Sequence, residues 1–298
     1  MIVASIDLGT NTFDLLILNV SANSRSVLHR SKEWVGLGLN FYPENNISEE
    51  SLHKAMRCID EFISIANHYK VQILTCAGTS ALREAKNANE LLDRIENLYN
   101  LKVEIISGEL EAALVFKGMS SFLDIPEGII MDVGGGSTEF TFFKDKLHIG
   151  CSSTKLGVTR LLALCPEHNR LSNVQINELK MHFLHECKSL ITKQKYLIGA
   201  SGVFETLAQE IIGNQLISSR LVQLPVKQLN DLLNMLICSS RYEREGMHWV
   251  PEYRRKYIHL AALQIQWVIK AFQIEAVFVT TSGLGEGLIS KAIESSEM

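Results

Sequence analysis

The sequence predicts an α/β protein built from two similar halves. One observation is a duplicated pattern: positions 7–12 read Asp-Leu-Gly-Thr-Asn-Thr, and positions 132–137 read Asp-Val-Gly-Gly-Gly-Ser. Each pattern lies between two short apolar runs, which is typical of a strand, a tight turn and a returning strand. The second observation is that strand-like and helix-like segments alternate along the chain. We therefore interpret the two patterns as an internal duplication.

The elements of the first half follow from apolar periodicity and from capping residues. Ser48 is a suitable N-cap for an amphipathic helix, and Glu49 and Glu50 suit its first turn. Glycine turns end the strand-like runs. The predicted elements are strands at 2–6 and 13–20, a helix at 48–69, a strand at 71–76, a helix at 81–100, a strand at 103–106 and a helix from Glu109.

The second half repeats this order of elements. A strand at 129–132 leads into the glycine turn and a returning strand at 139–143. Two further junctions of strand, glycine and helix are predicted at 199–202 and 282–287.

The length of 298 residues suits two domains better than one. Pro126 interrupts the chain near the middle, and no Pro-rich or Ser-rich linker is present. We predict a first domain at 1–124, completed by a C-terminal helix at 283–298, and a second domain at 125–282.

Composition excludes several classes of protein. Apolar residues make up 46% and charged residues 21%, so a disordered or fibrous chain is excluded. The formal net charge of −4 argues against nucleic-acid and membrane-surface partners. The sequence has no secretory signal, no apolar run of membrane-spanning length and no C-x-x-C pair among its six cysteines. We expect a cytoplasmic protein without disulfides or a zinc site.

The glycine turns predict a phosphate site. Glycine lets the backbone approach a ligand, and consecutive N–H groups bind phosphate oxygens. Hydroxyl groups beside the turns add donors, and the low positive charge favours neutral donors together with a metal ion. The hydroxyl candidates are Thr10, Thr12, Ser137 and Thr138.

Acidic residues beside these turns could hold the metal or act on water. Asp7 and Asp132 suit Mg²⁺, which needs only one or two protein carboxylates. The alternative, that each Asp only bonds its own turn, is made less attractive by the duplication. Glu111 could deprotonate a water, although spacing alone does not separate it from Glu109. Arg83 either contacts phosphate or is an ordinary solvated helix residue.

These residues, taken in order, resemble the Ppx/GppA phosphatases, a family of exopolyphosphatases and guanosine pentaphosphate phosphohydrolases. The likeness covers essentially the whole chain, and the order and spacing of its motifs are specific. The matching segments are Ile6–Phe13, Gly78–Arg83, Ile105–Ala112, Asp132–Glu139, Lys155–Gly157, Gly199–Gly202 and Ser282–Gly287.

The resemblance implies two actin-like (ribonuclease H-like) domains of the sugar kinase, Hsp70 and actin superfamily, with the active site in the cleft between them. It implies Glu111 as the general base, with Arg83 on phosphate. It also implies Asp132 as a ligand of Mg²⁺ (or Mn²⁺), with Asp7 and Glu139 as further ligands. The phosphate-binding positions that it implies are Thr10, Asn11, Thr12, Gly134, Gly135, Gly136, Ser137, Thr138 and Gly202.

The function that the resemblance implies is Mg²⁺-dependent removal of the terminal phosphate of inorganic polyphosphate. The alternatives are a guanosine pentaphosphate (pppGpp) 5′-phosphohydrolase and a non-hydrolytic (p)ppGpp-binding or nucleotide-switch protein. A homodimer is a candidate assembly. The sequence departs from the family at Leu110, where a glutamate is usual, and at Gly285, where an arginine is usual. A basic segment at 241–257 is either a partly exposed helix or interface, or a guide for an anionic chain.

Overall fold

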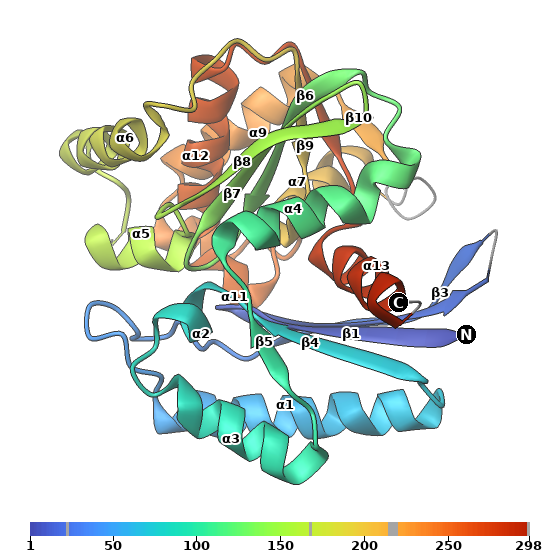
Figure 1. Ribbon diagram of the computed structural model, residues 1–298. Helices are drawn as coiled ribbons and strands as arrows, with labels where there is room; N and C mark the ends of the chain where they lie inside the picture. The colour runs from blue at the N-terminus through green and yellow to red at the C-terminus, as the bar shows by residue number, and fades with distance from the viewer. Residues whose placement is uncertain (22–23, 167–168, 214–219, 297–298) are drawn as a thin grey trace. The chain divides into compact units, whose positions relative to one another are not determined.

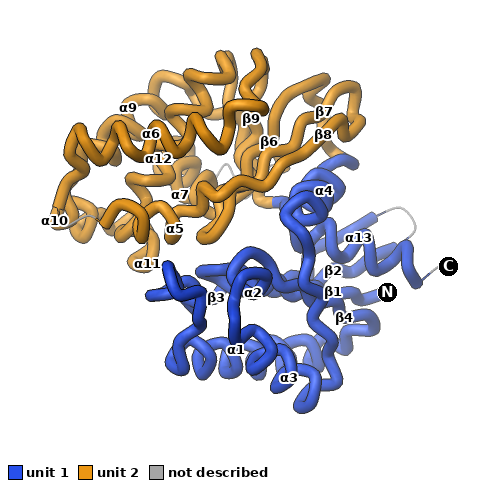
Figure 2. Tube along the Cα trace, turned by 60° about the vertical axis from the view of Figure 1, so that its left-hand side comes forward, with its two compact units in different colours: residues 1–121, 282–298 blue, residues 122–281 orange. Residues whose placement is uncertain are grey.

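The computed structural model describes residues 1–21, 24–166, 169–213 and 220–296 (Figure 1). The chain divides into two compact units, coloured separately in Figure 2. Unit 1 comprises residues 1–121 and 282–298, and unit 2 comprises residues 122–281. Among the described residues, no helix combines the length and the apolar character that crossing a bilayer requires.

Unit 1 contains a five-stranded mixed sheet in the order β3-β2-β1-β4-β5. The first three strands are antiparallel neighbours, whereas β4 and β5 continue the sheet in parallel with β1. The strands are β1 (Ile2–Leu8), β2 (Thr12–Val20), β3 (Arg25–Trp34), β4 (Ile73–Gly78) and β5 (Val103–Ile105).

The two faces of this sheet are covered by different helices, because successive strand residues point to opposite sides. On one face, Ile6, Leu15 and their neighbours pack with α1 (Glu49–His68) and α3 (Ala88–Tyr99), which lie side by side in Figure 1. On the other face, Val3, Leu16 and Leu18 pack with α13 (Leu284–Ser296). The last helix of the chain therefore completes the core of the first unit.

The prediction of a single helix at 81–100 is wrong. The segment is split into α2 (Ser80–Glu84) and α3 (Ala88–Tyr99). The break occurs because the Asn87 side chain bonds both the N–H and the carbonyl of Ile47, each at 2.9 Å. A side chain that satisfies distant backbone groups in this way competes with the helix.

Unit 2 contains a six-stranded mixed sheet in the order β10-β11-β9-β6-β7-β8. Here β6, β7 and β8 are antiparallel neighbours, and β9 and β11 continue the sheet in parallel with β6. The strands are β6 (Glu127–Val133), β7 (Thr138–Lys144), β8 (Leu147–Thr154), β9 (Tyr196–Gly199), β10 (Val222–Leu224) and β11 (Ala276–Val279). The α/β fold class is confirmed, and each unit repeats the same five-strand topology, to which β10 is an addition.

One core joins the sheet of unit 2 to its helices. The apolar helix α12 (Ile258–Ala271) supplies many of the buried side chains, including Leu260 and Val268. The other helices of unit 2 are α5 (Val158–Leu164), α6 (Asn173–Cys187), α7 (Gly202–Ile212), α9 (Val226–Cys238), α10 (Arg241–Glu245) and α11 (Glu252–Arg255).

Glycines allow α13 to pack closely on α4 (Gly108–Met119), which a short 3₁₀ turn (Ser120–Phe122) follows. A Cβ on Gly287 would lie 2.0 Å from the Leu114 carbonyl oxygen, and a Cβ on Gly118 would lie 2.3 Å from the Gly283 carbonyl oxygen. Both obstructions are backbone atoms, so side-chain movement cannot relieve them.

We expect Gly287→Ala to lower the free energy of unfolding by about 1–3 kcal/mol, because the added methyl group forces α13 away from α4. Chemical denaturation measures the change. Gly150→Ala is the matched control, since nothing lies within 4 Å of a Cβ at Gly150. Equal stability of the two variants would contradict the close packing of α13 on α4.

A capping box at the start of α10 generates a pH prediction. Glu243 accepts hydrogen bonds from the Ser240 N–H at 2.6 Å and the Ser240 hydroxyl at 2.7 Å, and it pairs with Arg170 at 2.9 Å. The bonds from Ser240, together with Arg170, lower the pKa of Glu243 to about 2.

Because the folded pKa is lowered, Glu243 stabilises the fold above its ordinary pKa near 4.5, and this stabilisation is lost as the pH falls towards 2. We expect Glu243→Gln to lower the melting temperature at pH 7, with a difference from wild type that shrinks below pH 4.5. Thermal unfolding at a series of pH values tests this, and a difference independent of pH would contradict it.

Candidate active site

The two duplicated turns have the same backbone geometry. The Gly9 N–H donates to the Thr12 carbonyl at 3.1 Å, and the Gly134 N–H donates to the Ser137 carbonyl at 3.0 Å. A Cβ on Gly9 would lie 2.6 Å from the Thr12 oxygen, and one on Gly134 would lie 2.9 Å from the Ser137 oxygen. Both turns therefore require glycine at this position.

The glycine loop of unit 2, residues 134–137, is held by its carbonyl groups. The carbonyl groups of its three glycines accept hydrogen bonds from the first turn of α5. The bonds run from Val158 N to Gly134 O (3.0 Å), from Thr159 N to Gly135 O (2.8 Å) and from Arg160 Nε to Gly136 O (2.9 Å).

These bonds determine where the N–H groups of the loop point. In a trans peptide the N–H is directed opposite to the carbonyl of the same peptide group. The N–H groups of Gly135, Gly136 and Ser137 are therefore directed away from α5. Three successive donors on one side of a loop form a site for the oxygens of a phosphate.

The turn of unit 1 is held in a related way. The Asn11 carbonyl accepts hydrogen bonds from the N–H groups of Val35 and Gly36, at 3.0 and 2.9 Å, and the Thr10 carbonyl accepts one from Gly38 at 2.8 Å. By the same argument, the N–H groups of Asn11 and Thr12 are directed away from the 35–38 segment. This turn offers two donors where the glycine loop offers three.

The hydroxyl groups beside the turns, which the sequence predicts to bind phosphate, belong to largely buried residues. Thr138 is 0% exposed, and its hydroxyl donates to the buried Gln264 side chain at 3.2 Å. The Thr12 hydroxyl donates to Asp14 at 3.2 Å. Thr10 and Ser137 are also buried. The hydroxyls of Thr12 and Thr138 thus already bond within the protein, whereas the backbone N–H groups of both turns are placed to donate to a ligand.

A carboxylate lies directly across the hairpin from each predicted metal ligand. Asp7 pairs with Asp14 between β1 and β2, and Asp132 pairs with Glu139 between β6 and β7. Directly opposed residues of an antiparallel pair share one face of the sheet, with Cβ atoms about 4.5–5.5 Å apart. Glu139 is 2% exposed and accepts a hydrogen bond from the Ser153 hydroxyl at 2.7 Å.

The donors of the second pair fit Mg²⁺. They are hard carboxylate oxygens, and a buried carboxylate beside another carboxylate needs a compensating cation. Among the described residues, no three His, Cys, Asp or Glu side chains are grouped to hold a metal ion. A cation at Asp132 and Glu139 would complete its coordination with water or substrate, as Mg²⁺ usually does.

Glu111 and Arg83 come together within unit 1. Ser107 caps α4 by accepting a hydrogen bond from the Leu110 N–H at 3.1 Å, and Glu111 follows in the first turn of the helix. The Arg83 guanidinium donates to the Ile106 carbonyl at 2.6 Å and lies 3.4 Å from the Glu111 carboxylate. Glu111 is 9% exposed, whereas Glu109 points to solvent. Burial and the contact with Arg83 therefore distinguish Glu111 from Glu109, which sequence spacing alone does not.

Cys76 on β4 is a buried thiol whose pKa is affected by Asp7. Burial raises the pKa of this thiol, and the charge of Asp7 raises it further. All six cysteines are free. A protonated thiol is a poor nucleophile, so Cys76 is not suited to covalent catalysis.

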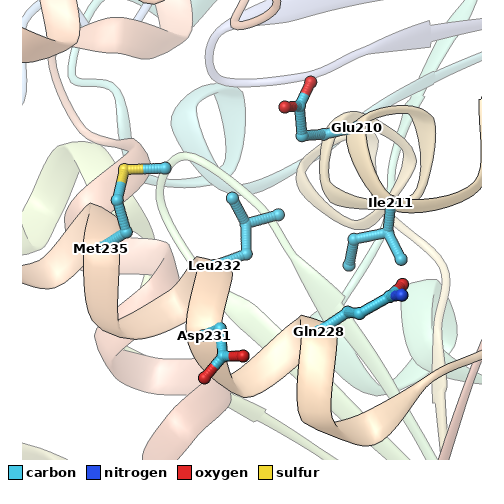
Figure 3. A pocket seen from close by; sticks show the side chains of 6 residues that line it. All are labelled: Glu210, Ile211, Gln228, Asp231, Leu232 and Met235. Atoms are coloured by element: carbon cyan, nitrogen blue, oxygen red, sulfur yellow. The ribbon is translucent and has the colours of Figure 1, made fainter.

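Gly202 begins α7, and its neighbour Ser201 is 8% exposed. The other end of this helix borders a pocket of about 410 Å³ between α7 and α9, where Figure 3 shows the carboxylates of Glu210 and Asp231 among the lining residues. Gly202 and Glu210 are eight residues apart, or about 12 Å along a helix. The acidic lining makes this pocket unsuited to a polyanion.

The basic segment at 241–257 is largely structural. Arg244 is 1% exposed and donates to the Ser239 and Arg255 carbonyls at 2.6 and 3.0 Å. Arg254 is 8% exposed and donates to the Thr206 hydroxyl at 2.8 Å. Neither guanidinium is placed on the surface, so these two cations do not form a surface guide for an anionic chain.

The sequence analysis missed Asp14, Arg160 and Gln264. Asp14 was detectable, because it follows Asp7 at the same distance as Glu139 follows Asp132. The contacts of Arg160 and Gln264 depend on how α5 and α12 pack against the glycine loop, and no local pattern carries that information.

The close approach of Gly157 to the glycine loop gives a test of this geometry. A Cβ on Gly157 would lie 2.1 Å from the Gly136 carbonyl carbon and 2.3 Å from the Gly135 oxygen. We expect Gly157→Ala to displace the loop and to weaken the binding of inorganic phosphate at least about tenfold.

Amide NMR shifts during phosphate titration measure this effect. In the wild type we expect the amides of Gly135, Gly136 and Ser137 to shift together. Gly246→Ala is the control, because a Cβ there meets only ordinary contacts at 3.5 Å and beyond. Unchanged loop shifts in the Gly157 variant would contradict the arrangement.

Comparisons with known proteins agree with these features. The model of the Ppx/GppA phosphatase family matches residues 16–296. The chain is 27% identical to the guanosine-5′-triphosphate,3′-diphosphate pyrophosphatase of Aeromonas salmonicida over 96% of its own length, but it spans only 58% of that relative.

Two solved structures share the fold over nearly their whole length. An exopolyphosphatase from Cytophaga hutchinsonii superimposes with a TM-score of 0.94 at 29% identity, covering 99% of this chain and 98% of the other. An Aquifex aeolicus member of the Ppx/GppA family gives a TM-score of 0.83 at 22% identity, with the same coverage. The chain belongs to the Ppx/GppA phosphatase family.

Proposed function

We propose that this protein is an exopolyphosphatase, which removes the terminal phosphate of inorganic polyphosphate with the help of Mg²⁺. The observation that carries the proposal is the glycine loop, whose three N–H groups face away from α5. The orienting contact between Arg83 and Glu111 adds a carboxylate suited to proton transfer. The exopolyphosphatase name of the Cytophaga hutchinsonii relative also supports the choice of substrate.

The proposed reaction is a hydrolysis at the terminal phosphorus. Glu111 accepts a proton from a water molecule while the water oxygen forms a bond to that phosphorus. The bridging P–O bond breaks, and its electron pair leaves with the shortened chain. The products are orthophosphate and a polyphosphate with one phosphate fewer. Phosphoryl transfer depends mainly on positioning and charge stabilisation, so this set of groups suffices.

The proposal assigns roles to groups of each unit, taken by itself. In unit 1, Arg83 is fixed by the Ile106 carbonyl and orients the Glu111 carboxylate. In unit 2, the loop N–H groups bind phosphoryl oxygens, and Asp132 and Glu139 hold the metal. When bound, Mg²⁺ neutralises negative charge on the phosphoryl oxygens.

The second candidate is a pppGpp 5′-phosphohydrolase. It requires the same cleavage of a terminal phosphoric anhydride, and the name of the Aeromonas salmonicida relative favours it. The Leu110 and Gly285 positions are where substrate choice could differ from that of other family members. Gly285 lies against the sheet, since the Ser5 hydroxyl donates to its carbonyl at 3.0 Å.

Phosphate release from short polyphosphate, long polyphosphate and pppGpp, measured in parallel with Mg²⁺ and with chelator, tests the proposal. We expect release from polyphosphate, and a loss of about 10²–10⁴-fold in kcat for Glu111→Gln, because the general base is removed. Asp132→Asn should also lower the rate and raise the Mg²⁺ concentration required.

Glu109→Gln is the matched control, because Glu109 lies in the same helical turn but is exposed. Its rate should stay within about twofold of wild type, as expected for a surface substitution. Release from pppGpp alone would replace the first candidate with the second. Binding of (p)ppGpp without hydrolysis of any substrate would contradict both.

A further inference from the structure

The third strand of each sheet places a different kind of residue beside the duplicated carboxylate pair. In unit 1, Lys32 on β3 lies directly across from Asp14. In unit 2, Ser153 on β8 lies directly across from Glu139. The two positions are equivalent in the shared topology, but one side chain is a cation and the other is neutral.

The pair in unit 1 contains its own compensating charge. Two carboxylates opposed across a hairpin repel each other, and a positive charge at contact distance offsets this repulsion. The Lys32 Nζ lies 3.1 Å from one oxygen of Asp14, and the Thr12 hydroxyl donates to the other oxygen at 3.2 Å. Both oxygens of Asp14 thus already have a donor from the protein.

In unit 2 the carboxylate on the second strand of the hairpin, Glu139, is buried, and its third-strand donor carries no charge. The side chain of Asp14 is 27% exposed, whereas Glu139 is only 2% exposed. Ser153 donates a neutral hydrogen bond to Glu139 at 2.7 Å. Burial strengthens the repulsion between two carboxylates, and the third strand places a positive charge beside the pair only in unit 1.

We propose that Lys32 is a built-in counter-ion that keeps a divalent cation out of the Asp7–Asp14 pair, so that this chain binds one divalent cation, at Asp132 and Glu139. Lys32 takes the electrostatic place that the metal takes in the other half of the duplication. The proposal rests on the proposed function only for the metal in unit 2. The role of Lys32 in unit 1 stands on the register and on the ion pair.

A swap of the two third-strand residues tests the proposal. Mn²⁺ serves as the probe, and its binding without substrate is measured from the free-ion electron paramagnetic resonance signal. We expect the wild type to bind one Mn²⁺ and Lys32→Ser to bind two, because that variant gives the first pair the neutral donor found at the second. Lys32→Arg keeps the positive charge and should bind one.

Two further variants locate the ions. Asp14→Asn combined with Lys32→Ser should return the stoichiometry from two to one. Ser153→Lys should lower it from one to none, because it gives the second pair the cation of the first. Circular dichroism with chelator present checks that each variant folds. The Lys32→Ser measurement decides the question even if Ser153→Lys does not fold, because Lys32 lies at the surface.

The outcomes separate this proposal from the proposed function. One Mn²⁺ in both wild type and Lys32→Ser overturns the role of Lys32 and leaves the metal in unit 2 intact. A raised KM in that variant without extra Mn²⁺ also overturns it, because Lys32 then serves the substrate. No Mn²⁺ in wild type but one in Lys32→Ser supports the role of Lys32 and removes the metal from the proposed function. No Mn²⁺ in either protein overturns both.

Discussion

The geometry of the candidate site in unit 2 depends on the hydrogen bonds between the first turn of α5 and the carbonyls of the glycine loop. A helix N-terminus usually offers its free N–H groups to a ligand. Here the first turn of α5 uses such groups to hold another backbone segment, and the donors for a ligand come from that segment instead. This arrangement explains why Gly157 has no side chain, since any Cβ there would enter the loop. It also gives Arg160 a structural task close to the site without requiring contact with substrate.

The duplication shows which features belong to the common scaffold and which have diverged. The strand topology, the glycine turn and the opposed carboxylates recur in both units. The residues that hold each turn differ: an irregular segment after β3 in unit 1, and the start of a helix in unit 2. The charge of the third-strand neighbour differs as well. The two units thus share a backbone arrangement but differ in the side chains around the turn, as is common when one fold supports several functions.

The sequence predicted strands that are buried apolar runs and helices with apolar periodicity, and it missed strands whose side chains are largely exposed, such as β3 and β8. The helix expected at 48–69 is present as α1, and the duplicated hairpin is present in both halves. β3 gave no signal because none of its residues is buried, and its pairing with β2 fixes it as a strand. In the site, the sequence identified the turns and Glu111, but the inward direction of the Thr138 hydroxyl depends on Gln264, a residue 126 positions away.

The return of the chain to unit 1 has a consequence for folding during synthesis. The face of the first sheet formed by Val3, Leu16 and Leu18 is covered by Ile289 and Ile293, which follow the whole of unit 2 in the sequence. Unit 2 is a continuous segment that is complete before those residues exist. Apolar surface of the first sheet therefore stays uncovered while all of unit 2 is translated. The nascent chain carries an aggregation-prone face throughout the synthesis of unit 2, and chaperones that shield such faces have that time to act on the first sheet.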